Sequence, residues 1–201
     1  FFGANQGTEQ FTTLENNLVK VTFSNKGGRV VSATLKDYNN QQGEPLTLFN
    51  EEESAMNFAF EGKNENILTE DLFFQPINVT DSTVTMRLQT TGAGYIDFAY
   101  RLLPESYMVN FDVRAVGMQN FFPAAQKTVH IDWFQKARQQ EKGFDFEQRY
   151  TSLTYKPVND GSDYLSEMSD DKETFEEPME WIAFKSQFFS SVLIANQDFD
   201  N

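Results

Sequence analysis

Cysteine is absent from the chain, and histidine occurs once, at His130. Without cysteine there is no disulfide bond, no thiolate metal ligand and no cysteine nucleophile. A single histidine leaves only carboxylates as further side-chain metal ligands, and the stretch Asp160–Asp163 fails the spacing of a calcium loop. We therefore expect no bound metal and no other cofactor.

Long apolar runs are absent too, since no stretch approaches the roughly 20 apolar residues that a membrane-spanning helix needs. Basic residues are few: 16 Lys and Arg stand against 30 Asp and Glu, for a formal net charge of −14. A field of this sign repels phosphate groups, so we expect no nucleic-acid binding and no broad adhesion to an anionic membrane. The start, Phe1–Gly7, lacks the features of a signal peptide.

Aromatic residues are plentiful, with 21 Phe, 7 Tyr and 2 Trp among 201 residues. Their rings suit the pleated, half-buried faces of β-sheets. Packing in the core of a sandwich explains most of them, and a groove for an apolar ligand is the alternative role for some. The length allows one all-β domain or two small ones, and the lack of a clear boundary favours one.

The segment Thr13–Leu35 predicts a β-hairpin. Apolar residues alternate with polar ones over residues 19–23 and again over residues 31–35, which is typical of two half-buried antiparallel strands. Gly27 and Gly28 lie between them, and glycine adopts the positive φ that a tight turn often requires. These glycines are expected to shape the turn, because they lack the pattern of a phosphate-binding loop.

Similar patterns predict the other strands, at 46–49, 56–60, 83–89, 96–102, 107–115, 129–133, 151–156, 181–184 and 189–195. We expect the last two to be buried. Good helix formers over Phe134–Lys142, before Gly143, predict a short helix, and polar composition predicts loops over 61–71 and 159–178. Residues 1–12 are expected to form a linker, and residues 13–201 one mainly antiparallel all-β domain with one or two short helices.

No catalytic motif accompanies these elements. His130 lies in a strand-like context, where a structural role is far more common than catalysis. The chain has no nucleophile elbow, and acidic pairs such as Glu176–Glu177 are expected by chance among 30 carboxylates. We therefore expect that the protein is not an enzyme.

Two aromatic pairs have both a structural and a functional interpretation. Phe121–Phe122 precedes Pro123 and is expected in a loop, while Phe188–Phe189 follows the apolar run Trp181–Phe184. Core packing is the preferred interpretation of the second pair. Exposure of either pair would instead indicate a surface for a partner or a ligand.

Three stretches resemble the large periplasmic domain of the YidC membrane protein insertase family. They are TLENNLVKVTFSNKGGRVVSATL (Thr13–Leu35), the strand-rich passage Phe98–Gly117, and EWIAFKSQFFSSVLIA (Glu180–Ala195). They stand in the order that the family has. We define the signature residues of the resemblance as Gly27, Gly28, Trp181, Lys185, Gln187, Phe188 and Phe189.

The resemblance implies a β-super-sandwich similar to galactose mutarotase, on the periplasmic face of the inner membrane of a Gram-negative bacterium. It implies an interaction or chaperone-like module of a multi-pass insertase, which supports membrane protein insertion with or without the Sec translocon. The partners that it implies are SecDF, other Sec components and nascent membrane proteins. The family's insertase core lies outside this chain, so no catalytic residue is carried over. The isolated domain is expected to be a monomer.

Two alternatives remain, a carbohydrate-binding module and a sugar enzyme of the mutarotase type. Mutarotase chemistry needs a histidine acid and a glutamate base around the sugar ring, and a single strand histidine without the motif argues against it. Hydrophobic helices in the parent protein, before and after this chain, would separate the insertase domain from a free-standing carbohydrate-binding module.

Overall fold

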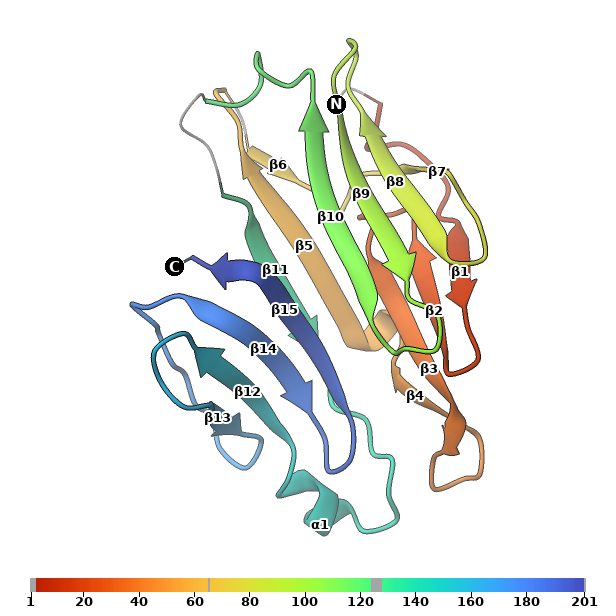
Figure 1. The fold of residues 1–201 in the computed structure, drawn as a ribbon, viewed down its shortest axis with the longest axis vertical. Coiled ribbons are helices and arrows are strands. Elements are labelled where there is room, and N and C mark those ends of the chain that lie inside the picture. The colour runs from red at the N-terminus through yellow and green to blue at the C-terminus, as the bar shows by residue number, and fades with distance from the viewer. Residues whose placement is uncertain (1–2, 65, 124–127, 201) are drawn as a thin grey trace. The chain divides into compact units, whose positions relative to one another are not determined.

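The computed structural model describes residues 3–64, 66–123 and 128–200. Backbone contacts divide the chain into two compact units. Unit 1 contains the described residues up to Asn39 together with Pro45–Phe134, and unit 2 contains Asn40–Glu44 together with the described residues from Gln135 onward. Both units consist of antiparallel strands (Figure 1), so the all-β class is confirmed, whereas a single domain over 13–201 remains a prediction.

The first sheet of unit 1 contains the predicted hairpin. Its strands are β1 (Phe11–Glu15), β2 (Val19–Ser24), β3 (Val30–Asn39) and β4 (Pro45–Phe49), in that order across the sheet. The antiparallel pairing of β2 with β3 sets Val21 opposite Ala33, and the apolar face of β2 is buried. The alternating pattern is therefore confirmed as one buried face of a strand pair.

Two further sheets complete unit 1. One has the order β10-β9-β8-β7, from β7 (Gln75–Ile77), β8 (Thr83–Gln89), β9 (Tyr95–Leu102) and β10 (Val109–Val116). The other has the order β11-β5-β6, from β5 (Ser54–Glu61), β6 (Asn66–Leu68) and β11 (His130–Gln135), and the 3-10 turn η1 (Glu51–Glu53) precedes β5. The predicted meander β8–β10 and the strand β11 are confirmed.

The strand β6 corrects the predicted loop over 61–71. Its three residues pair with β5, where Ile67 lies opposite Phe60 and both side chains are buried. A single apolar residue in a polar stretch carries too little periodicity to predict a strand, so burial against a neighbour decides its structure.

The core of unit 1 is an aromatic cluster centred on Phe98 of β9. This side chain is fully buried, and its ring centroid lies 4.7 Å from that of Phe58, 5.0 Å from that of Phe74 and 5.5 Å from that of Phe111. These rings come from different sheets and from the loop before β7. The abundance of phenylalanine is thus largely explained by core packing.

Unit 2 contains one four-stranded sheet and the short helix α1 (Phe144–Gln148). Its strands are β12 (Ser152–Pro157), β13 (Asp163–Ser166), β14 (Met179–Lys185) and β15 (Ser190–Phe199), in the order β13-β12-β14-β15. Both strands of the C-terminal hairpin lie where they were predicted, but β15 is not buried. Val192 and Ile194 are exposed on it, and as alternate residues they lie on the same face of the strand.

The predicted helix over Phe134–Lys142 is wrong. Phe134 belongs to β11, which ends at Gln135. Residues 136–142 are irregular, and α1 starts after Gly143. The buried carboxylate of Glu147 accepts the backbone N–H groups of Gln140, at 3.0 Å, and of Glu141, at 3.1 Å. This side chain supplies the hydrogen bonds that helical carbonyls would otherwise supply, so tertiary structure overrides propensity.

The N-terminal segment is more ordered than a linker. Phe11 and Thr12 belong to β1, and Gln10 exchanges two hydrogen bonds with Asn25, of 2.7 Å through the side-chain oxygen and 3.0 Å through the backbone. The predicted linker over 1–12 therefore needs correction, since its last residues pair with the β2–β3 turn; Phe1 and Phe2 lie outside the described residues. The helical segments in the described ranges are η1 and α1, and neither is long and apolar enough to cross a membrane.

Candidate interaction surfaces

The side chains that could take part in catalysis or metal binding are dispersed. Over the described residues, no three His, Asp or Glu side chains come together in a way that could hold a metal ion. His130 is exposed, and its Nε2 lies 3.6 Å from Oε1 of Glu61, which is exposed as well. A pair of this kind contributes little to stability and faces bulk water. Asp160 and Asp163 accept hydrogen bonds from the next residue's backbone, which is turn geometry.

The sequence did not predict one contact between two glutamate side chains. Burial raises the pKa of the Glu51 carboxyl, and the nearby Glu9, which also shares a hydrogen bond with it, raises this pKa further. Glu9 in turn accepts a hydrogen bond of 2.5 Å from the Ser24 hydroxyl. Arg29 opposes the shift through its positive charge. No local pattern joins Glu9 with Glu51, since the fold alone brings these distant positions together.

The Glu51→Gln variant is expected to be more stable than the wild type near neutral pH. The pKa of Glu51 is higher in the folded than in the unfolded chain, so its contribution is favourable below the unfolded pKa and is lost as the pH rises through the folded pKa. The advantage of the variant should therefore disappear at about pH 3.5. Urea unfolding at the two pH values measures this difference. The exposed Glu70→Gln is the control for loss of one negative charge, and an equal gain in both variants would contradict the prediction.

The signature glycines form a buried turn between β2 and β3. Gly27 has φ +77° and Gly28 has φ +65°, as a left-handed turn requires. The Gly27 N–H donates to the Leu72 carbonyl at 2.8 Å, and the Gly28 carbonyl accepts from the Tyr100 hydroxyl at 2.8 Å. Burial raises the pKa of this tyrosine well above its usual range. Since both glycines are buried, they hold the turn in unit 1 and offer no open surface.

A Gly28→Ala substitution is expected to destabilise the fold by about 2 kcal/mol. The new Cβ would meet the Phe74 ring at 3.0 Å and would also require a positive φ, and the two costs add. Gly43→Ala is the matched control, because φ there is +82° and nothing lies within 4 Å of the new Cβ. Thermal or urea unfolding should show a loss of about 1 kcal/mol for the control. Equal losses would mean that Phe74 does not resist the methyl group.

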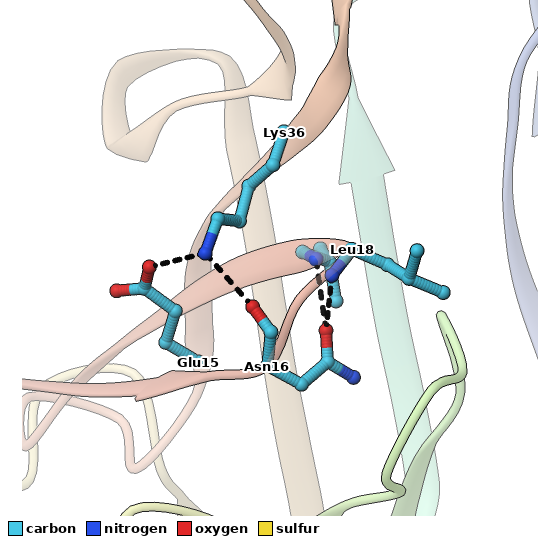
Figure 2. Close-up of polar contacts among 5 residues, drawn as sticks. Glu15, Asn16, Leu18 and Lys36 are labelled. Carbon is cyan, nitrogen blue, oxygen red and sulfur yellow. Dashed lines mark hydrogen bonds and ion pairs between the residues drawn. The ribbon is translucent and has the colours of Figure 1, made fainter.

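Asn16 connects the β1–β2 turn to a loop that is distant in sequence. Its Oδ1 accepts the N–H groups of Leu18, at 2.8 Å, and Val19, at 2.9 Å, within the β1–β2 turn (Figure 2). Its Nδ2 donates to the carbonyls of Leu103, at 2.8 Å, and Ser106, at 2.7 Å, in the β9–β10 loop. The sequence analysis did not single out this residue, although an asparagine side chain in a turn often accepts hydrogen bonds from backbone N–H groups a few residues further along the chain.

A surface ion pair accompanies Asn16 on its outer side. The Lys36 ammonium donates to Oε1 of Glu15 at 2.8 Å and to the Asn16 carbonyl at 3.0 Å (Figure 2). The hydrogen bond and the charge of Lys36 lower the pKa of the Glu15 carboxyl. Figure 2 shows these groups around the turn, where they tie β3 to the end of β1. They are structural contacts that connect the two strands.

The other five signature residues lie in unit 2, on β14 and in the β14–β15 turn. Trp181 faces Ile194 on one side and Lys156 on the other, and it is half-buried. Lys185 ends β14, and its ammonium donates to the Tyr150 carbonyl at 3.2 Å. In the turn, Gln187 and Phe189 are half-buried, whereas Phe188 is exposed. The structure therefore places the two groups of signature residues in different units.

The exposed Phe188 changes the interpretation of its pair. Core packing was preferred for Phe188–Phe189, but the first ring of the pair is among the most exposed large apolar side chains of the described chain. Phe122 of the other pair is half-buried in a loop and stacks on Phe60 at 6.0 Å. Core packing therefore does not hold for Phe188, and a contact surface at this position remains a prediction.

Comparison with known proteins gives a consistent result. A family model described as the YidC periplasmic domain matches residues 12–201. A protein of Phocaeicola vulgatus named membrane protein insertase YidC is 72% identical over 200 residues, which is 100% of this chain and 32% of that protein. Proteins of the same name from Bacteroides fragilis and Porphyromonas gingivalis are 50% and 40% identical, over 100% and 98% of this chain and 32% of each relative. The chain thus spans about a third of the length of these curated relatives.

Proposed function

Because the chain belongs to the YidC periplasmic domain family, we propose that it serves a membrane protein insertase as a non-catalytic interaction module. The family match over residues 12–201 is the observation that carries the proposal. In this role, the parent protein lies in the inner membrane and this part faces the periplasm. The relatives continue well beyond the matched segment, so the insertase activity belongs to the parent protein as a whole.

The dispersal of reactive groups supports a role through surface contact. His130 faces solvent beside Glu61, and the described carboxylates form no metal-binding group. The buried glycine turn and the Asn16 contacts stabilise the fold. Exposed aromatic side chains, by contrast, provide area for a partner. The proposed partners are nascent membrane proteins and components of the Sec translocon, including SecDF.

Co-purification from membranes tests this proposal. The full-length parent insertase is extracted in mild detergent, beside a version in which residues 13–200 are replaced by an unrelated β-sandwich. We expect Sec components with the intact protein and about tenfold less of them with the replacement. Equal recovery from both proteins would contradict the proposed contact. The isolated chain should bind the same components weakly, as a monomer.

Sugar chemistry is the outcome that would contradict the proposal most clearly. Each relative named above carries the name of an insertase, so the comparisons do not favour a carbohydrate-binding module or a mutarotase. Interconversion of sugar anomers by the 201-residue chain, lost in a His130→Ala variant, would establish an enzyme instead. We expect the wild-type chain and its His130→Ala variant to show the same rate of anomer interconversion, equal to that of the uncatalysed reaction.

A further inference from the structure

The turn between β12 and β13 contains the one Asp-Gly pair of the sequence, Asp160–Gly161. Both residues are exposed, and the space beside Gly161 is open, with nothing within 4 Å of where a Cβ would lie. The Gly161 N–H donates to Oδ1 of Asp160 at 2.7 Å, so this backbone nitrogen lies beside the side-chain carboxyl of the preceding residue. Two groups held this close can react with each other when nothing shields the nitrogen.

Two other exposed aspartates make the same contact but precede larger residues. The Tyr164 N–H donates to Oδ1 of Asp163 at 2.8 Å, and the Lys172 N–H donates to Oδ1 of Asp171 at 2.8 Å. Gly161 differs from Tyr164 and Lys172 in having no side chain, which leaves its nitrogen accessible and its backbone free to rotate. The hydrogen bond is therefore shared by three positions, and the following glycine distinguishes one of them.

A lysine ammonium lies at the backbone carbonyl of Asp160. Nζ of Lys156 donates to this oxygen at 2.7 Å and to the Pro157 carbonyl at 2.7 Å. Oε1 of Glu180 lies 3.4 Å from the same ammonium, and the Lys156 side chain is only 25% exposed, so several contacts hold it in place. A cation in this position stabilises negative charge that develops on the Asp160 carbonyl oxygen.

We propose that Asp160 is a site of spontaneous conversion to isoaspartate and that Lys156 directs the reaction to the isoaspartyl product. In the first step the Gly161 nitrogen bonds to Cγ of Asp160, and the carboxyl hydroxyl leaves as water with the amide proton. The product is a five-membered succinimide. In the second step water adds to the backbone carbonyl carbon of Asp160, whose bond to the Gly161 nitrogen breaks. The nitrogen regains a proton from this water and stays bonded to Cγ.

The position of Lys156 decides which carbonyl of the succinimide reacts with water. Attack at the former side-chain carbonyl returns aspartate, whereas attack at the backbone carbonyl gives isoaspartate. Since the ammonium lies at the backbone carbonyl, it favours the second route and then pairs with the new carboxylate. The product keeps the charge of Asp160 and adds one methylene to the main chain of the turn, next to the pairing of Tyr155 with Asp163.

Incubation of the 201-residue chain in water enriched in heavy oxygen tests the site. The folded chain is held for weeks at mildly acidic pH and about 37 °C, below the transition of an ordinary mesophilic domain. Each hydrolysis introduces one heavy oxygen, and chromatography with mass spectrometry separates aspartyl from isoaspartyl peptides. We expect isoaspartate to form about tenfold faster at Asp160 than at Asp163 or Asp171. Formation at position 160 that is no faster than at the other two would overturn the site.

A matched pair of variants tests the role of the glycine. Gly161→Val shields the nitrogen and should slow the reaction at Asp160 by about tenfold. Ser162→Val places the same side chain one residue further along the exposed turn and should leave the rate unchanged. Circular dichroism with thermal unfolding verifies that both variants fold. Equal rates in the two variants would contradict attack by the Gly161 nitrogen.

The Lys156→Met variant tests the directing role. It removes the ammonium but keeps an unbranched side chain, so we expect the ratio of isoaspartate to aspartate among labelled peptides to fall by about threefold. Lys142→Met, at an exposed lysine on another segment, should leave the ratio unchanged. In urea the contact is lost, and the wild type and Lys156→Met should give equal ratios. A ratio in folded Lys156→Met equal to that of the wild type, or the same difference in urea, would overturn the role of Lys156.

Discussion

Replacing Phe98 by alanine is expected to lower the free energy of unfolding by about 3–5 kcal/mol. The side chain is fully buried in unit 1, and its ring contacts those of Phe58, Phe74 and Phe111 at centroid distances of 4.7, 5.0 and 5.5 Å. Truncation would remove the apolar area of one ring and leave a cavity that aromatic neighbours fill poorly. This loss is a large share of the stability of an ordinary domain.

Urea unfolding monitored by tryptophan fluorescence measures this loss. Trp133 lies on β11 in unit 1 and Trp181 on β14 in unit 2, so variants that keep one tryptophan report on the units separately. If residues 13–201 form the single domain that we predict, Phe98→Ala shifts both transitions together. Phe11→Ala, at an exposed position, should change the stability by no more than about 0.5 kcal/mol. A loss as small as that of the Phe11→Ala control would contradict the aromatic core if it were measured for Phe98→Ala.

An Asn16→Ala substitution is expected to cost about 3 kcal/mol. The side chain makes two hydrogen bonds to amides of its own turn and two to the carbonyls of Leu103 and Ser106. Each bond contributes about 0.5–1.5 kcal/mol, and part-buried groups that lose their partner add a desolvation cost. Asn17→Ala is the matched control, because the next residue has an exposed side chain and should tolerate the change.

The Asn16→Asp variant separates the two halves of this contact. An ionised aspartate still accepts from Leu18 and Val19, but its oxygens would face the carbonyls of Leu103 and Ser106, which repel them. We therefore expect a loss at neutral pH as large as that of the alanine variant, and partial recovery where the new carboxyl is protonated. Urea unfolding across the pH range gives the profile. A pH-independent, near-neutral effect of Asn16→Asp would mean that the bonds to the β9–β10 loop contribute little.

The strands were largely predictable because their signal is local. In a strand with one buried face, apolar residues alternate with polar ones, as in β2 over Val19–Phe23 and in β9 over Ile96–Leu102. This pattern can be recognised without knowing the partner strand. Where the signal depends on a neighbour, prediction failed. β6 relies on the burial of Ile67, and the segment before α1 is irregular because Glu147 supplies its hydrogen bonds.

The functional surfaces were less predictable than the fold. Phe188 was assigned to the core because an apolar run does not show where a strand ends and a turn begins, and Phe188 lies in the turn between β14 and β15. The contact between Glu9 and Glu51 and the hydrogen bond from Lys185 to the Tyr150 carbonyl join segments that are far apart in sequence. The signature glycines were interpreted correctly, since a positive φ is a property of the turn itself.

Photocrosslinking in native membranes tests the surface role of this domain most directly. A photoreactive phenylalanine analogue replaces Phe188 in the full-length parent insertase, and a second protein carries it at Tyr164, which is equally exposed on the same unit. We expect crosslinks from position 188 to membrane proteins, and markedly fewer from position 164. Equal or absent crosslinks at both positions would contradict a specific interaction surface at the β14–β15 turn.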